Sequence, residues 1–591
     1  MRTTRMRAAV ALIAVAVLGL SACGASDDDG GDGGGGGDTP SLDNSGVDSV
    51  VNESDAKGGT LKMGLGGAWG DSFDPGDTYY GYSWDLGRNY FRTLVMFKPA
   101  PGKAGLELVP DLATDLGKSS DGGKTWTYTI QSGLKYEDGT PFTSKDIAYA
   151  VSRTFDRAEL KQGPNYFEPL LNWPKGYKGP FKGPKDADIS SAIETPNDTT
   201  IVFHLKNPFS EFDYLAMLPQ TAPVPAAKDT GSKYTTHPIS SGPYMWDGDV
   251  NVSTGGTLVR NPNWDASTDP NRAALPDQID VKLGLQADDL DNQIIAGDED
   301  VDIAGTGVQP AALPKVLQQQ ELQERADNPV AARLWYTQII PTVKPLDNIE
   351  CRKAIMYAMS PASYQNAYGG EFAGGDIATT LLPPMIGGYE DFDLYGQKDN
   401  PNGQPDKAKE ALEKCGQPDG FEINMGFRSE RPKEKATAEA FQQALGKVGI
   451  KVNIKPLADD TYTSETCGKP SYNVKNNIGL CTYGWAADWN TGYGFLAQIV
   501  DGRLIQPQGG SANFSVNIPE VDKMLDELVL EQDEAKRNEI SGQIDKRVME
   551  EAVIYPGIYA KGVLIRSKNA TNVFVNDAFG YYDYTAMGVK Q

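Results

Sequence analysis

Few residues of this chain can carry acid–base or metal chemistry. Histidine occurs only twice in 591 residues, as His204 and His237. This scarcity argues against a metal site built from several histidines and against most histidine-based catalysis. The chain has no G-x-S-x-G or H-E-x-x-H pattern, and no S-x-x-K motif with its partner motifs. We therefore expect no enzyme, no metal and no cofactor, and a secreted hydrolase is the disfavoured alternative.

One acidic residue stands among aromatic residues in the segment 483–489 (YGWAADW). A carboxylate in a closed cleft is costly unless it is paired, so Asp488 could bind a cation through charge-assisted hydrogen bonds. From the spacing alone, an acidic loop packed against core aromatic side chains is the simpler interpretation.

The cysteines separate into one near the start of the chain, Cys23, and four in the body, Cys351, Cys415, Cys467 and Cys481. No C-x-x-C spacing occurs, which disfavours a structural zinc site. Four cysteines allow three disulfide pairings. The 14-residue spacing favours a bridge between Cys467 and Cys481, which leaves Cys351 with Cys415.

The first residues predict export. Three arginines precede a short apolar run, residues 8–20, which is too short for a confident membrane span and matches a secretory signal. The run ends in Leu-Ser-Ala-Cys23, which resembles a bacterial lipobox. That resemblance implies cleavage after residue 22 and a lipid anchor on Cys23 at the outer face of the bacterial cytoplasmic membrane. The alternative is a plain signal peptide with a chance cysteine.

Residues 23–58 read as a disordered tether, because this Gly- and Asp-rich segment cannot bury enough apolar surface to fold. The whole chain has 55 Lys and Arg against 80 Asp and Glu, a net charge of −25. Binding to nucleic acid needs a basic surface, so no nucleic-acid partner is expected.

The body mixes strand and helix patterns. Period-2 alternation predicts strands at 60–65, 126–130, 201–205 and 279–285, and a capping signal at 143–146 predicts a helix. Between 342 and 555, strands and helices alternate, which predicts a parallel sheet covered on both faces. The expected strands are 421–427 and 450–457, and the expected helices are 350–359, 406–414, 434–448, 519–531 and 534–551.

Several separated motifs follow one another along the body: 110–115 (PDLATD), 123–130 (GKTWTYTI), 133–146 (GLKYEDGTPFTSKD), 241–244 (SGPY), 260–264 (RNPNW), 348–359 and 518–522 (IPEVD). In order and coverage they resemble the family 5 extracellular solute-binding proteins, the dipeptide and oligopeptide receptors of ABC importers. The resemblance spans about residue 60 to 591.

The resemblance implies an α/β, two-lobe periplasmic-binding-protein-like fold of the class II type with an extra inserted subdomain. Lobe I would combine 59–90, 222–340 and 556–591, and the inserted subdomain would be 91–221. Lobe II would be 341–555, and the ligand would be closed between the lobes.

The resemblance also implies ligand-binding residues. Asp488 would meet the α-ammonium of a peptide, Gly484 would let the ligand backbone approach, and Trp485 and Trp489 would form walls of side-chain pockets. Tyr483 and Ala486 belong to the same segment.

Two further regions complete the expected site. Tyr79, Tyr80 and Tyr82 fall where the first ligand-contacting loop of the family lies. Arg428 follows the predicted strand 421–427 and would reach a ligand carboxylate. Thr482 stands where some oligopeptide receptors carry a basic residue, which is a departure from their pattern.

We therefore expect a monomeric, membrane-anchored receptor that delivers short peptides, or another amine-bearing solute, to an ABC permease. The same fold could instead bind an oligosaccharide, an opine-like compound or a metal chelate, and a neutral sugar would not need the anionic Asp488. A receptor that senses peptides without importing them is a further alternative.

Overall fold

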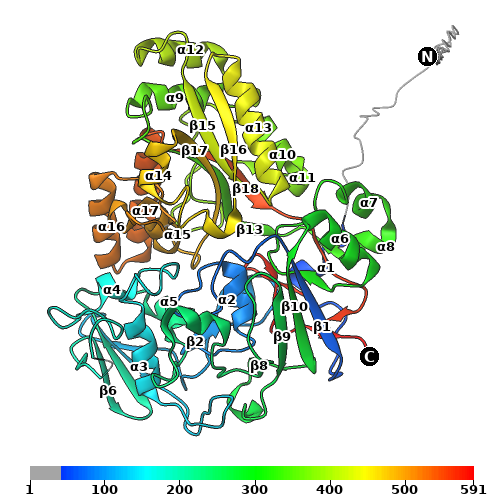
Figure 1. Ribbon diagram of the computed structural model, residues 1–591, viewed down its shortest axis with the longest axis vertical. Coiled ribbons are helices and arrows are strands. Elements are labelled where there is room, and N and C mark those ends of the chain that lie inside the picture. Colours follow the sequence, from blue (N-terminus) through cyan, green and yellow to red (C-terminus); the bar gives the residue numbers. More distant parts are fainter. Residues whose placement is uncertain (1–41, 185, 511) are drawn as a thin grey trace, which may run out of the picture. The chain divides into compact units, whose positions relative to one another are not determined.

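The computed structural model describes residues 42–184, 186–510 and 512–591 (Figure 1). The predicted signal peptide, 1–22, and the predicted lipidation site, Cys23, lie outside these ranges. Within them, no helix is long and apolar enough to cross a membrane.

The predicted disordered tether ends earlier than residue 58. Leu42 is buried in an apolar cluster with Ile294 and Val316. A short helix, α1 (Ser45–Asp48), follows, and the Gly46 N–H donates a 2.8 Å hydrogen bond to the Asp327 carboxylate. Residues 42–58 thus belong to the folded body, because an apolar side chain and buried backbone bonds hold them there. Composition alone conceals this.

The first large sheet has five strands in the order β11-β1-β10-β9-β8. Its central strands, β1 (Thr60–Gly66) and β10 (Gln278–Leu285), run parallel, as β1 does with β11 (Val301–Asp302). β9 (Gly255–Arg260) and β8 (Tyr244–Trp246) complete the sheet as antiparallel neighbours. The predicted strands 60–65 and 279–285 are confirmed.

A four-stranded antiparallel sheet, β4-β5-β7-β6, lies within the predicted inserted subdomain, 91–221. Its strands are β4 (Lys118–Ser120), β5 (Thr125–Thr129), β6 (Ile193–Asn197) and β7 (Thr200–His204). Helix α3 (Ser144–Arg153) packs on it, and Thr143 and Asp146 form the predicted capping box at its start.

The third sheet has six strands in the order β14-β18-β13-β17-β15-β16. They are β13 (Val330–Ile339), β14 (Gly375–Ile377), β15 (Glu422–Arg428), β16 (Lys451–Leu457), β17 (Ile478–Ala486) and β18 (Ile554–Lys561). Parallel pairing is confined to β15 with β16 and β15 with β17, so the expectation of a parallel sheet holds for half of it. β13 is antiparallel to both of its neighbours, β17 and β18, and together β13 and β18 carry the sheet beyond the predicted boundaries 341–555.

All five helices expected in this region are present, as α9 (Ile349–Ala358), α12 (Pro405–Lys414), α13 (Pro432–Gly446), α16 (Pro519–Leu530) and α17 (Glu534–Glu550). Helix α13 packs on β15 and β16, as Figure 1 shows.

Two disulfides brace this region. Cys351 of α9 is joined to Cys415, the residue after α12, and Cys467 is joined to Cys481 of β17. This is the pairing that the cysteine spacing favoured. The second bridge fixes the loop after β16 to the strand whose end leads to Asp488.

Candidate functional site

A cavity of about 90 Å³ lies where the predicted lobe I meets the predicted lobe II. It is polar enough and large enough to hold several water molecules. The sequence-predicted residues that line it are Tyr79, Tyr80, Tyr483, Gly484, Trp485, Ala486 and Asp488.

Asp488 lies between the end of β17 and the start of α15 (Gly492–Val500). Its carboxylate accepts hydrogen bonds from the Tyr166 hydroxyl at 2.6 Å and from the Tyr79 hydroxyl at 3.1 Å. The side chain is buried, and no lysine or arginine of the described chain forms an ion pair with it. The carboxylate is thus oriented by two neutral donors and lacks a cation.

Burial raises the pKa of Asp488 from its usual value to about 7, although the hydrogen bonds from Tyr166 and Tyr79 oppose that rise. Desolvation disfavours the charged carboxylate, and nothing but the two hydroxyls compensates. A bound ammonium would supply the missing positive charge and favour the ionised form. The electrostatics therefore suit a cationic group at this end of the cavity.

The Tyr79 loop is organised by Asp71, a cavity-lining residue that the sequence did not single out. The Asp71 carboxylate accepts the backbone N–H of Tyr79 at 3.0 Å and of Tyr80 at 3.0 Å, and the Thr78 hydroxyl at 2.8 Å. The loop then continues into helix α2 (Gly81–Gly87). These bonds aim the Tyr79 side chain at Asp488.

The aromatic walls come from both halves of the cavity. The rings of Tyr79 and Trp485 meet edge to face, with centroids 5.7 Å apart, and the Trp485 indole N–H donates to the Phe495 carbonyl at 2.8 Å. At Gly484, an added Cβ would lie 2.2 Å from the Trp335 ring. Trp335 therefore requires glycine at this position, and Gly484 also lines the cavity, so the approach of a ligand backbone stays a prediction.

Two predicted residues lie outside this cavity. Trp489 packs behind Asp488, where its indole N–H donates to the Glu211 carboxylate at 2.7 Å and its ring stacks on Tyr214. Tyr82 is buried, and its hydroxyl donates to the Trp69 carbonyl at 3.1 Å. Both residues support the cavity wall from behind, so the expectation that they contact the ligand is not supported.

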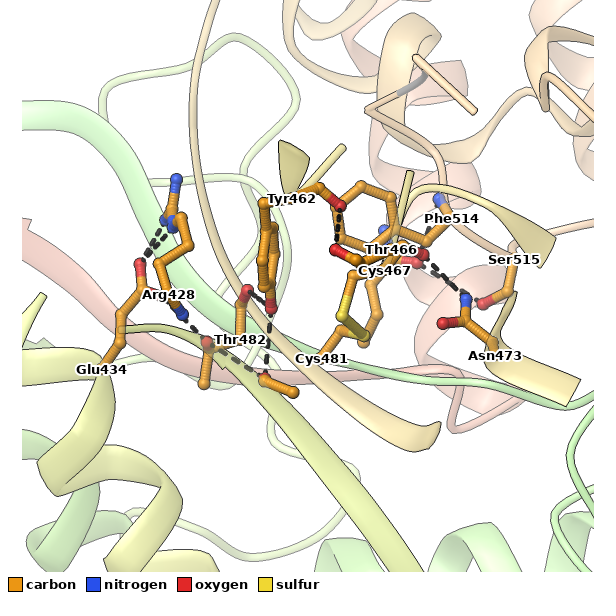
Figure 2. The surroundings of a disulfide bond; sticks show 12 residues. Arg428, Glu434, Tyr462, Thr466, Cys467, Asn473, Cys481, Thr482, Phe514 and Ser515 are labelled. Atoms are coloured by element: carbon orange, nitrogen blue, oxygen red, sulfur yellow. Dashed lines mark hydrogen bonds and ion pairs between the residues drawn. A yellow bond between two sulfur atoms is a disulfide. The ribbon is translucent and has the colours of Figure 1, made fainter. Parts of the chain in front are cut away.

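Arg428 is also held away from the cavity. Its guanidinium is ion-paired with Glu434, with Nε 2.8 Å from Oε1, and Figure 2 shows the two side chains facing each other. The guanidinium also lies over the rings of Tyr462 and Tyr483. Thr482 is buried beside them and donates to Glu434 at 3.1 Å. The expected contact between Arg428 and a ligand carboxylate is therefore not supported, because Arg428 does not line the cavity and Glu434 binds its Nε and one terminal nitrogen.

The cavity contains an arginine that the sequence analysis missed. Arg333 of β13 lines it, opposite Ala486 of β17 in the strand register. A signal was present: Arg333 is the only charged residue in the otherwise apolar or neutral strand 330–339. Recognising it needed the pairing of β13 with β17, two strands about 150 residues apart in sequence.

No group of three or more His, Cys, Asp or Glu side chains in the described ranges could hold a metal ion. The polar side chains that line the cavity in the described part of the chain include two carboxylates, tyrosine hydroxyls, an amide and a guanidinium, which together suit reversible recognition of charged groups.

Comparison with protein families gives one assignment. The family model described as bacterial extracellular solute-binding proteins, family 5 (middle), matches residues 107–504. The glutathione-binding protein GsiB of Escherichia coli O6:K15:H31 is 25% identical over 492 residues, which cover 81% of this chain and 87% of GsiB. The probable D,D-dipeptide-binding periplasmic protein DdpA of Escherichia coli K12 is 26% identical over 517 residues, covering 85% and 89%.

Solved structures are similar over almost the whole chain. The clavulanic acid biosynthesis oligopeptide binding protein 2 has a TM-score of 0.83 and 40% identity, covering 93% of this chain and 99% of that one. The periplasmic binding protein DppA of Helicobacter pylori, in complex with the peptide STSA, has a TM-score of 0.73 and 19% identity, covering 91% and 99%. The second similarity concerns the fold alone.

Proposed function

The chain belongs to the family 5 bacterial extracellular solute-binding proteins, and on that premise we propose that it captures short peptides by their ammonium group. The predicted α/β, two-lobe periplasmic-binding-protein-like fold is confirmed by the structural neighbours. The named relatives are binding proteins, in agreement with the expectation that this chain is not an enzyme.

The observation that carries the proposal is Asp488, a buried carboxylate that faces the cavity without a cation. An ion that is removed from water is stabilised when an opposite charge and hydrogen-bond donors surround it. A peptide ammonium offers both at once. Relatives that are named for binding glutathione or dipeptides support this ligand class, because both ligands carry a free amine.

Native mass spectrometry of the purified protein tests the ligand class. We expect a bound mass that fragments into amino acids and that is lost on mild denaturation. A carbohydrate or a metal chelate in its place would contradict the proposal. Calorimetry with the identified peptide and its N-acetyl form then tests the role of the ammonium, because acetylation removes the charge and keeps the remaining contacts.

We further propose that the protein is anchored to the outer face of the membrane through Cys23 and hands its peptide to an ABC permease. The motif that ends at Cys23 and the family membership support this. Replacing Cys23 with alanine should move the protein from the membrane fraction to the soluble fraction. A variant that still sediments with membranes would exclude the lipid anchor and leave peptide binding untouched.

A further inference from the structure

A tryptophan of the predicted lobe II is buried in the predicted inserted subdomain, 91–221. Trp489 follows Asp488 directly, yet it packs in the apolar cluster that residues of 91–221 mainly form. Its ring stacks on Tyr214, with centroids 5.7 Å apart, and its centroid is 5.0 Å from that of Tyr166. The side chain beside Asp488 is therefore held by a different part of the chain.

Glu211 completes this contact at the polar edge of the indole. Its Oε2 accepts the Trp489 indole N–H at 2.7 Å and the Thr491 hydroxyl at 2.8 Å, and its Oε1 lies 3.4 Å from Nε of Arg537. All three partners belong to the predicted lobe II, whereas Glu211 belongs to the predicted inserted subdomain. A buried carboxylate that accepts charge-assisted hydrogen bonds from another region holds the two regions together.

Two further contacts link Trp489 to Asp488. The Asp488 N–H donates to the Gly494 carbonyl at 3.0 Å, and an added Cβ at Gly494 would lie 2.8 Å from the Trp489 ring. Tyr166, whose hydroxyl donates to the Asp488 carboxylate at 2.6 Å, packs on the same ring. A shift of the indole would therefore disturb both the backbone of Asp488 and the hydroxyl that orients its carboxylate.

A neighbouring acid has no such contact with the predicted lobe II. Asp213, two residues after Glu211, accepts the Gly117 N–H at 2.9 Å and the Tyr128 hydroxyl at 2.8 Å. Both donors lie within 91–221. The bonds to Asp213 thus stabilise the predicted inserted subdomain itself, whereas the bonds to Glu211 join it to the segment that carries Asp488.

We propose that Glu211 is a positioning residue for peptide binding, which holds Trp489 in the predicted inserted subdomain and thereby sets how long the ligand stays bound. This rests on the proposed function, with the peptide ammonium at Asp488. Glu211 and Trp489 lie outside the lining of the cavity, so neither adds a contact to the ligand. Without this contact the two regions separate sooner, which raises the dissociation rate and leaves the choice of ligand unchanged.

The experiment measures how fast bound peptide leaves. The unmodified protein and its variants are loaded with a pool of two- to five-residue peptides that have free amino termini, diluted, and followed by native mass spectrometry. Glu211→Ala should release the pool about tenfold faster or more, because hydrogen bonds to a charged group are lost. Glu211→Gln retains a carbonyl acceptor for the indole N–H, so its release rate should stay within about threefold of the unmodified rate.

Trp489→Phe tests the other side of the same contact. It retains an aromatic ring and removes the N–H donor, so release should again be faster than from the unmodified protein. Because both substitutions remove one hydrogen bond, combining Trp489→Phe with Glu211→Ala should add little to the effect of Glu211→Ala alone.

Two controls separate the possible failures. Asp213→Ala should lower the thermal midpoint and keep the unmodified release rate, because its partners are internal. Every variant should still reject an N-acetylated pool, because Asp488 is retained. An unmodified release rate in Glu211→Ala or in Trp489→Phe overturns the proposal while peptide capture stands, as does equally fast release from Glu211→Gln and Glu211→Ala, or from Asp213→Ala and Glu211→Ala. Retention of neither pool by the unmodified protein overturns the proposed function itself.

Discussion

Two carboxylates line the same cavity and are equally buried, with 7% of Asp71 and 7% of Asp488 exposed. Asp71 is bonded by Thr78, Tyr79 and Tyr80, residues 7 to 9 positions further along its own loop. Asp488 is bonded by hydroxyls from residues 409 and 322 positions away. The bonds to Asp71 stabilise the conformation of its loop, whereas the bonds to Asp488 orient a carboxylate toward the cavity, where a ligand can reach it. Burial alone therefore does not distinguish a carboxylate with a structural role from one that binds a ligand. The sequence distance of the residues that donate hydrogen bonds to the carboxylate does distinguish them.

Removing Asp488 should have the largest effect on ligand binding. Asp488→Ala should weaken peptide binding several hundred-fold or more, because a buried ammonium without its partner costs about 3–5 kcal/mol. Calorimetry at pH 7.5 measures this loss. The isosteric Asp488→Asn should lose affinity without lowering the thermal midpoint of the empty protein. Unchanged affinity in both variants would remove Asp488 from the site.

The converse substitution acts on stability. Asp71→Ala leaves the N–H groups of Tyr79 and Tyr80 without an acceptor, so the free energy of unfolding should fall by about 3 kcal/mol. Denaturant titration of the empty protein measures this value, and Asp71→Asn, which retains one carbonyl acceptor, should lose less. A loss near zero would show that the loop holds its shape without Asp71.

The affinity for an ammonium ligand at Asp488 should depend on the pH of the solution. Its pKa of about 7 in the empty cavity means that the proton must leave before an ammonium binds well. Affinity should therefore fall as pH drops, by roughly 25-fold between pH 7.5 and pH 5.5. The groups that face the carboxylate, Tyr79 and Tyr166, do not titrate in this range, because burial raises the pKa of both. A flat profile in the unmodified protein, equal to that of Asp488→Asn, would contradict this assignment.

The smallest expected effects come from the two hydroxyls. Tyr166→Phe removes the 2.6 Å bond and should weaken binding about tenfold, whereas Tyr79→Phe removes the 3.1 Å bond and should weaken it about threefold. Calorimetry on the two variants under one buffer condition gives the order. The reverse order would mean that Tyr79, and with it the Asp71 loop, orients Asp488 more than Tyr166 does.

Much of the fold could be predicted from sequence because it is locally encoded. The capping box at Thr143 and Asp146 and the alternation in β7 and β10 carry their own signals. The mixed direction of the six-stranded sheet could not be predicted, because β13 and β18 join it from outside the region of alternating strands and helices. Leu42 gave no signal either, because Val316, one of its partners, is about 270 residues away.

The residues of the candidate site could likewise be predicted only where the local sequence carries a signal. The segment that ends at Asp488 was found because one acid stands among aromatic residues, and the family resemblance gave it a role. Arg428 was misassigned because the end of a strand indicates a place near a ligand, while its partner Glu434 is visible only once α13 folds back. Arg333 was missed because its place at the cavity depends on the pairing of β13 with β17, two strands about 150 residues apart in sequence.

The adjacency of β13 and β17 has one more consequence. Asp488 follows the end of β17 by two residues, and β17 is hydrogen-bonded to β13, whereas Tyr79 and Tyr166 reach Asp488 from other parts of the chain. If those parts move away, Asp488 stays attached to the end of β17, but it loses the two hydroxyls that orient its carboxylate. A ligand could then contact Asp488 first, and the contacts of Tyr79 and Tyr166 with Asp488 would form around a ligand that is already bound.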